Sequence, residues 1–300
     1  ASPLKALQKL AEQHRDRFQI PVIGITGSNG KTVVKEWLHQ LLSPERVITR
    51  SPRSYNSQIG VPLSVWLLNE QSQAGVFEAG ISEPGEMQAL RGIIQPDIAV
   101  LTFIGDAHQK NFSSLEEKCR EKVVLFHDTK TIVYCKDDEV VDRVVRSVGY
   151  KGENLAWSMS DRSAALFVES VERKGLTSTI HYIYNGETGE YVLPFIDEAS
   201  VRNSVTTAVV ALYLGLSRER LAERMASLEP VAMRLEVKKG QRGCTLINDS
   251  YNSDINSLDI ALDFMSRRPD HKGRKRTLIL SDIYQTGEPL DELYKEVSNL

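Results

Sequence analysis

The sequence is poor in the features that mark specialised classes of protein. It has only three cysteines in 300 residues, Cys119, Cys135 and Cys244, and they form neither a CxxC metal site nor a disulfide framework. No apolar run approaches the roughly 20 residues that a membrane helix needs, and the first residues lack the apolar core of a secretory leader. The formal net charge of −3 leaves no basic excess for nucleic acid. We therefore expect a cytoplasmic protein with reduced thiols, no nucleic-acid partner and no membrane contact.

Apolar runs and amphipathic stretches alternate over the first 150 residues. A helix is expected at 4–17, a buried strand at 22–26 and a second helix at 33–42. Further strands are expected at 46–49, 75–79, 97–103 and 131–135, and the helices between them at 62–68, 86–94, 114–126 and 138–147. Repeated βα units of this length predict an α/β fold, in which a parallel sheet carries helices on both faces.

The pattern changes after residue 154, where short stretches rich in β-branched and aromatic residues are separated by Lys174-Gly175 and Asn185-Gly186. Because Asn-Gly is a strong hairpin signal, strands at 164–172, 177–184 and 190–195 predict a small antiparallel sheet. Helices are expected at 200–214 and 218–227, and Pro230 marks a boundary. Strands at 235–239, 244–248 and 277–281 with a helix at 254–266 predict the start of a Rossmann-like α/β domain. The expected domains are therefore 1–230 and an incomplete 231–300.

A glycine-rich turn joins the strand at 22–26 to the helix after it, and reads Gly27-Ser28-Asn29-Gly30-Lys31-Thr32. Its glycines let backbone N–H groups approach an anion, the helix N-terminus adds its dipole, Lys31 suits the outer phosphates and Thr32 suits Mg²⁺. The GxxxxGK[ST] spacing is not met, because Gly24 lies one residue too far from Gly30. The turn predicts a site for ATP and Mg²⁺; its plain alternative is a structural turn with a solvated lysine.

This short loop resembles that of the Mur ligase family, which makes the peptide stem of bacterial peptidoglycan. Other segments are similar to family motifs in the same order along the chain. They are Asn56-Ser57 with Ile59-Gly60-Val61-Pro62, Glu78-Ala79-Gly80, Ile104-Gly105-Asp106-Ala107-His108, Lys122, Arg202-Asn203, Arg234-Leu235-Glu236 and Asn248-Asp249-Ser250-Tyr251-Asn252. Three positions depart from the pattern, since Ser57 replaces an Asn of the substrate loop, and Arg202 and Thr206 replace a His and the second Asn on the adenine side.

The resemblance implies a role for each matching position. Lys31, Lys122, His108 and Arg234 would be catalytic, and Thr32, Glu78, His108 and Lys122, the last as a carbamate, would hold Mg²⁺. The nucleotide would be bound by Gly27, Ser28, Asn29, Gly30, Lys31, Thr32, Asn203, Arg234 and Asp249. The acid and amine substrates would meet Asn56, Ser57, Tyr251 and Asn252.

The resemblance also implies an activity. The Asp-Ser-Tyr-Asn form at 249–252 is typical of the branch that adds D-Ala-D-Ala to UDP-N-acetylmuramoyl-tripeptide, through an acyl phosphate made from ATP. Residues 1–230 would be the central ATP-binding domain and 231–300 the first part of the C-terminal domain. The family's UDP-sugar domain is not among these 300 residues, so they are expected to ligate poorly alone, and fusion to further domains stays open.

Three alternatives stay open from the sequence. A folylpolyglutamate synthase-like ligase would share the core but is expected to lack the 249–252 sequence. A P-loop kinase or GTPase would be expected to have the standard spacing, and a non-catalytic nucleotide-binding module would need only the loop. The candidate residues also have plain readings: solvated side chains for Glu78, His108 and Lys122, a turn or cap for Asp249, and a surface ion pair for Arg234.

Overall fold

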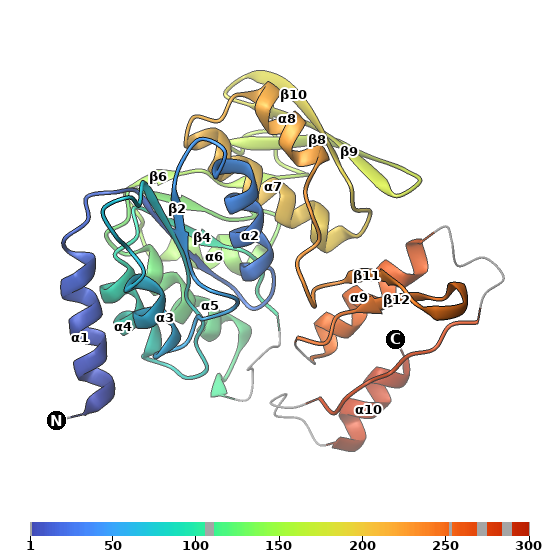
Figure 1. The fold of residues 1–300 in the computed structure, drawn as a ribbon, viewed down its shortest axis with the longest axis horizontal. Helices are drawn as coiled ribbons and strands as arrows, with labels where there is room; N and C mark the ends of the chain where they lie inside the picture. The colour runs from blue at the N-terminus through green and yellow to red at the C-terminus, as the bar shows by residue number, and fades with distance from the viewer. Residues whose placement is uncertain (1, 106–110, 252–253, 269–274, 284–289, 300) are drawn as a thin grey trace.

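A computed structural model of the chain describes residues 2–105, 111–251, 254–268, 275–283 and 290–299. Its centre is a six-stranded sheet in the order β2-β3-β1-β4-β5-β6 (Figure 1). All neighbouring strands of this sheet run parallel. The strands are β1 (Val22–Thr26), β2 (Ile48–Arg50), β3 (Ala74–Glu78), β4 (Ile98–Leu101), β5 (Thr131–Val133) and β6 (Glu153–Asn154). The predicted α/β fold is confirmed, and β6 is a strand that the sequence reading did not predict.

Helices cover both faces of this sheet, as expected, because alternate strand residues point to opposite sides. Ile23 and Ile25 belong to the core that contains α2 and α7, whereas Val22 belongs to the core that contains the helices of the other face. The first face carries α2 (Lys31–Leu42), α7 (Glu198–Tyr213) and α8 (Arg218–Ala226). The second carries α1 (Pro3–Arg15), α3 (Gly60–Val65), α4 (Glu86–Ile94), α5 (Leu115–Val123), a 3₁₀ turn η2 (Val124–Phe126) and α6 (Glu139–Ser147).

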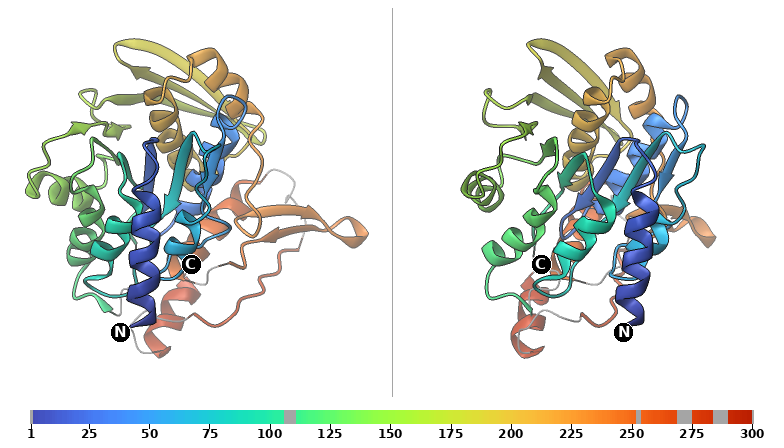
Figure 2. Two further views of the ribbon diagram at one scale, coloured as in Figure 1. Left: turned by 60° about the vertical axis from the view of Figure 1, so that its left-hand side comes forward. Right: turned by 90° about the vertical axis from the view of Figure 1, so that its left-hand side faces the viewer.

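The predicted antiparallel sheet is also present. It is built from β8 (Leu166–Lys174), β9 (Thr177–Tyr184) and β10 (Glu187–Leu193), which pair in the antiparallel sense. A short fourth strand, β7 (Trp157–Ser158), joins the sheet parallel to β8, so that the order is β10-β9-β8-β7. Asn185 and Gly186 have φ angles of 52° and 77°, the left-handed conformation that a tight hairpin requires. In both views of Figure 2 this sheet lies at the top and the C-terminal elements lie towards the bottom.

The C-terminal elements are grouped beside the main sheet in Figure 1. They are β11 (Glu236–Lys239), a 3₁₀ turn η3 (Gln241–Gly243), β12 (Thr245–Asn248), α9 (Ile255–Arg267) and α10 (Leu290–Asn299). β11 and β12 pair in the antiparallel sense, and α10 was not anticipated. The division into domains at residue 230 and the Rossmann-like continuation stay predictions.

The expected strand at 277–281 is wrong, since residues 275–283 have no regular secondary structure. The apolar run Thr277 to Ser281 met the pattern of a buried strand, but Leu278 and Ile279 are exposed by 53% and 91%. A strand needs a hydrogen-bonded neighbour as well as an apolar pattern. The pattern alone could not supply that neighbour.

Two further observations bear on the sequence expectations. Cys119 and Cys135 are buried free thiols, whereas Cys244 is exposed despite its apolar neighbours. Within the described residues, no helix combines the length and the apolar character needed to cross a membrane.

Candidate functional site

The glycine-rich turn lies where the strand order of the parallel sheet reverses, the usual place for a ligand in such sheets. β1 ends at Thr26, α2 begins at Lys31, and Gly27 and Gly30 have φ angles of 143° and 88°. A Cβ at Gly27 would collide with the hydroxyl of Thr102, and one at Gly30 would collide with the amide oxygen of Asn203. Both positions therefore need glycine for conformation and for space.

Lys31 folds back over its own loop. Its ammonium donates hydrogen bonds to the carbonyl oxygens of Gly27 at 2.7 Å and Ser28 at 2.9 Å. The pKa of Lys31 is lowered to about 8, chiefly by burial; the charge of Glu78 raises it and the charge of Arg234 lowers it. Within the described part of the chain, no carboxylate forms an ion pair with Lys31, so the loop presents a cation that can meet an anion.

Glu78 ends β3 beside the loop because Ile25 of β1 is in register with it. Its carboxylate is fully buried. One oxygen, Oε2, accepts hydrogen bonds from the hydroxyl of Thr32 at 3.2 Å and the amide of Asn56 at 3.3 Å. The other, Oε1, lies 3.0 Å from the ammonium of Lys35.

These oxygen atoms fit Mg²⁺. Magnesium prefers hard oxygen ligands and is usually held by one or two carboxylates together with substrate phosphates. The hydroxyl of Thr32 and the carboxylate of Glu78 meet that description beside the phosphate loop. Among the described residues, no cluster of three or more His, Cys, Asp or Glu side chains could hold a metal alone. A metal at this place could complete its coordination with oxygen atoms from a bound phosphate.

Lys122 of α5 reaches the same loop from the other side. Its ammonium is buried and donates to the carbonyl oxygen of Gly27 at 3.2 Å. Burial holds the pKa of Lys122 well below its ordinary value, and the nearby charges of Lys31 and Lys118 lower it further. Lys118, one turn earlier on α5, donates to the carbonyl of Gly105. Lys31, Lys118 and Lys122 therefore all lie at or beside the loop. His108, the other residue predicted for this place, lies outside the described residues.

A polar pocket opens beside this centre. It is lined by Gly27, Ser28, Lys31, Asn56, Ser57, Gln58, Gly80, Ile81, Ser82, Glu86 and Lys122. Asn56 is fixed by its backbone carbonyl, which accepts from the N–H of Gly80 at 2.8 Å. The hydroxyl of Ser57 accepts from the N–H of Gly60 at 3.2 Å. Ser57 thus helps to start α3, which gives it a structural task as well as a place in the pocket.

The C-terminal elements also contact the glycine-rich loop. The amide of Asn29 donates to the hydroxyl of Ser257 in α9 at 3.4 Å. The guanidinium of Arg234 lies 4.1 Å from the centre of the Tyr251 ring. Asp249 accepts from the N–H of Leu235 at 3.1 Å, so it links the segment before β11 to the segment after β12. Asn252 lies outside the described residues.

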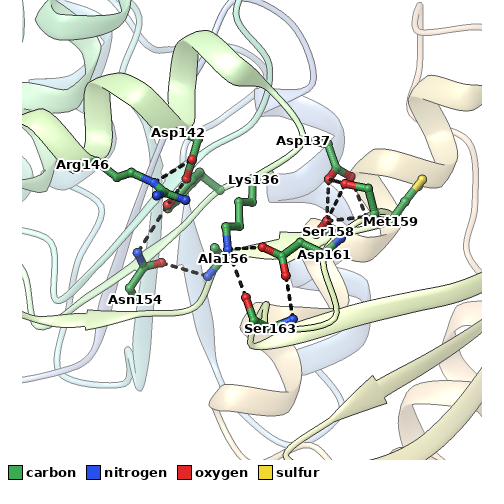
Figure 3. A network of polar contacts seen from close by, with 12 residues as sticks. Lys136, Asp137, Asp142, Arg146, Asn154, Ala156, Ser158, Met159, Asp161 and Ser163 are labelled. Carbon is green, nitrogen blue, oxygen red and sulfur yellow. Dashed lines mark hydrogen bonds and ion pairs between the residues drawn. The ribbon is translucent and has the colours of Figure 1, made fainter.

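The segments after β5 and β7 are held together by a polar network, drawn in Figure 3. Asp137 accepts from the hydroxyl of Ser158 at 2.5 Å and from the N–H of Met159 at 2.7 Å. Lys136 forms an ion pair with Asp161 in the same network. These contacts fix the backbone next to Trp157, whose indole N–H donates to Thr206 of α7.

Two residues of α7 bear on the adenine side of the expected nucleotide site. Asn203 points its amide oxygen at Gly30, which brings α7 against the phosphate loop. Thr206 instead donates to the carbonyl of Arg202 and accepts from the indole N–H of Trp157, both at 3.0 Å. The hydroxyl of Thr206 is therefore engaged in packing α7 against β7.

Sequence reasoning missed Lys35, Ser54 and Lys118. The hydroxyl of Ser54 lies 2.9 Å from that of Thr32. The two lysines had a signal in the helical period, since Lys35 follows Lys31 by four residues and Lys118 precedes Lys122 by four. Residues four apart lie on the same face of a helix. A lysine one turn from a site lysine was therefore a candidate.

Comparison with known proteins fits this geometry. A family model described as the Mur ligase middle domain matches residues 25–211 of this chain. The chain belongs to the Mur ligase family. That assignment covers the phosphate loop, Glu78, Lys122 and Asn203, all of which lie within the matched residues.

Relatives with curated names extend the match to the C-terminal elements. A "UDP-N-acetylmuramoyl-tripeptide--D-alanyl-D-alanine ligase" of Bacillus subtilis is 27% identical over 296 residues, which cover 98% of this chain and 63% of the relative. A protein of the same name from Treponema pallidum is 29% identical over 296 residues, covering 98% of this chain and 62% of the relative. The chain thus spans less than two thirds of the length of these Mur ligases.

Solved structures share the fold. A "MurF ligase from Thermotoga maritima in complex with ADP" has a TM-score of 0.85 at 24% identity, covering 99% of this chain and 68% of that one. A MurF from Acinetobacter baumannii has a TM-score of 0.82 at 23% identity, covering 99% of this chain and 64% of that one. The likeness extends beyond the matched middle domain to β11, β12 and α9.

Proposed function

We propose that this chain is the ATP-binding core of a ligase that adds D-Ala-D-Ala to UDP-N-acetylmuramoyl-tripeptide. The observation that carries the proposal is the convergence of Lys31, Thr32, Glu78 and Lys122 on one loop at the carboxyl edge of the sheet. The names of the relatives support the choice of substrates. The expected cytoplasmic location, without nucleic-acid or membrane partners, belongs to the same proposal.

An amide cannot form readily from a free carboxylate, so the tripeptide carboxylate first takes the γ-phosphoryl group of ATP. The amine of D-Ala-D-Ala then attacks the carbonyl of this acyl phosphate, and phosphate leaves. Phosphoryl transfer depends on position and on neutralised charge. Lys31 and the backbone N–H groups of the loop would hold the phosphates, while Asn203 and Arg234 would approach the nucleotide from α7 and the C-terminal elements.

Mg²⁺ would be held by Thr32 and Glu78, and when bound it supplies positive charge against the phosphate oxygens. A second metal near Lys122 and His108 stays a prediction from the family resemblance. A carbamate forms only from a neutral amine, and the burial that lowers the pKa of Lys122 favours that form. Asn56 and Ser57 line the pocket in which the acid substrate would lie.

The remaining roles predicted from the resemblance fall on the C-terminal elements. Asp249 would serve the nucleotide, and Tyr251 and Asn252 the amine substrate. Tyr251 lies under Arg234, so a movement of one side chain would affect the other. These roles are proposed for the chain within a longer protein, since the chain spans 63% of the Bacillus subtilis relative.

Calorimetry and a phosphate-release assay test the proposal together. We expect ATP to bind in the presence of Mg²⁺ and Lys31→Ala to remove most of the binding. Phosphate release should need both UDP-N-acetylmuramoyl-tripeptide and D-Ala-D-Ala, and should be far slower with these 300 residues than with a longer protein that carries a UDP-sugar domain. Orientation of bound substrates can account for ~7–11 kcal/mol of a barrier. Unchanged ATP affinity in Lys31→Ala would refute the nucleotide site.

A folylpolyglutamate synthase-like activity is the alternative within the family. The two enzymes differ in the amine that they add, so glutamate with a folate should replace the cell-wall substrates in the same assay. Phosphate release with that pair alone would favour the alternative. A non-catalytic nucleotide-binding module would bind ATP and release no phosphate with either pair, even in the longer protein.

A further inference from the structure

Lys35 is a buried cation beside the phosphate loop, and the proposed function gives it no task. It lies on α2, one turn after Lys31, and its side chain has no exposed surface. Its ammonium lies 3.0 Å from Oε1 of Glu78 and 3.1 Å from Oε1 of Glu36. Burying an ammonium is expensive unless it is paired and hydrogen-bonded. These contacts satisfy Lys35 and at the same time restrain Glu78.

Lys35 also fixes the backbone beside Glu78. It donates to the carbonyl oxygens of Ser51, at 2.9 Å, and of Arg53. The next residue, Ser54, lies with its hydroxyl 2.9 Å from that of Thr32. The ammonium of Lys35, which belongs to α2, therefore contacts both the segment after β2 and the end of β3, and holds these three elements together.

The two oxygens of Glu78 consequently have different tasks. Oε1 forms the ion pair with Lys35, without a hydrogen bond, whereas Oε2 accepts the hydrogen bond from the hydroxyl of Thr32. A carboxylate held in this way can give a metal one oxygen atom in a fixed direction. Groups that orient a ligand in this manner commonly change metal affinity 10- to 100-fold when they are removed.

We propose that Lys35 is a positioning residue that holds Glu78 for one-oxygen coordination of the nucleotide-bound metal. The inference rests on the proposed function, since it assumes that Glu78 meets a cation delivered with ATP. Two effects of Lys35 oppose each other, because its positive charge repels the metal while its contacts orient the ligand. The proposal holds that orientation outweighs repulsion.

Mn²⁺ is a suitable probe, because it accepts the oxygen ligands that Mg²⁺ uses and its free form is counted by electron paramagnetic resonance. The whole chain is titrated with Mn²⁺ in the presence of a non-hydrolysable ATP analogue. Affinity for the analogue without metal is measured separately by calorimetry in EDTA. For Lys35→Met we expect metal-free affinity within about twofold of the original and Mn²⁺ affinity at least tenfold weaker. Unchanged or tighter Mn²⁺ binding, or an equal loss of both affinities, overturns the proposal.

Lys35→Arg keeps the positive charge but changes how the side chain contacts Glu78, so it distinguishes the effect of charge from that of orientation. It can also replace Lys35→Met in the test if that variant does not fold. A guanidinium binds a carboxylate through both oxygens, so this variant should likewise weaken Mn²⁺ binding at least tenfold. Full Mn²⁺ affinity in Lys35→Arg would mean that only the charge matters, which overturns the proposal.

Glu36→Gln is the matched control, since it removes the other carboxylate partner of Lys35 and leaves the contact with Glu78. It should bind Mn²⁺ as the original chain does.

The same titrations separate this inference from the proposed function. If the unaltered chain binds no ATP analogue with or without metal, the proposed function fails and the inference falls with it. If the unaltered chain binds Mn²⁺ with the analogue, Lys31→Ala abolishes binding and Lys35→Met has no effect, only the role of Lys35 is wrong.

Discussion

Replacing Lys31 by methionine should make the ligand-free protein more stable while removing its affinity for ATP. The pKa of Lys31 falls from an ordinary 10.5 to about 8, chiefly through burial. The folded state therefore holds this proton about 3 kcal/mol more weakly than the unfolded state does. The side chain of Lys31 is half-buried, so solvent screens its charge in part. We therefore expect Lys31→Met to raise the free energy of unfolding by about 1–3 kcal/mol.

The difference in stability between Lys31→Met and the original protein should change with pH in a defined direction. Between pH 8 and 10.5 the unfolded state binds more protons at Lys31 than the folded state, so the stability of the original protein rises with pH in that window. Below pH 8 the penalty is fully present. The advantage of Lys31→Met should therefore be largest near pH 7 and disappear as the pH approaches 10.5.

Urea unfolding at pH 7, 8.5 and 10, followed by circular dichroism, measures the difference directly. The charge of Lys31 also lowers the pKa of Lys122, so its removal should raise that pKa and add a gain in stability of the same sign. A variant that is less stable than the original at pH 7, or a difference that does not change with pH, would refute the electrostatic reasoning. A gain in stability with retained ATP affinity would refute the role of Lys31 instead.

Three further predictions concern the same loop and the helix beside it. ATP binding at pH 8.5 should take up a proton at Lys31, because the phosphates favour its charged form; calorimetry in two buffers of different ionisation enthalpy should show the uptake, and Lys31→Ala should abolish it. Gly30→Ala should destabilise the fold by about 1–2 kcal/mol and weaken ATP binding, since a left-handed residue gains a Cβ against Asn203; thermal unfolding that matches the original would contradict this. Thr206→Val should cost about 1–3 kcal/mol by leaving the indole N–H of Trp157 unpaired, yet leave ATP affinity intact; a large loss of affinity would instead place Thr206 at the nucleotide.

Local sequence determined much of this protein. Asp138, Asp197, Ser217 and Asp254 each accept a hydrogen bond from the backbone N–H three residues on. They begin α6, α7, α8 and α9 close to the predicted starts, because capping depends on neighbouring residues only. The Asn185-Gly186 hairpin followed in the same way from turn chemistry. The loop between Gly27 and Thr32 was recognisable because its glycines, lysine and hydroxyl are consecutive.

Tertiary structure decided the rest. The run at 277–281 had the composition of a strand and has no partner among the described residues, since pairing is not encoded within one segment. Ser57 and Thr206 stand at positions where the family motifs have Asn, and their hydroxyls are engaged by α3 and by Trp157. Lys35 was not among the residues predicted for the site, and only the packing of α2 against β3 brings its ammonium to Glu78. A sequence records which groups are available, but the distances between separate elements determine which of them meet.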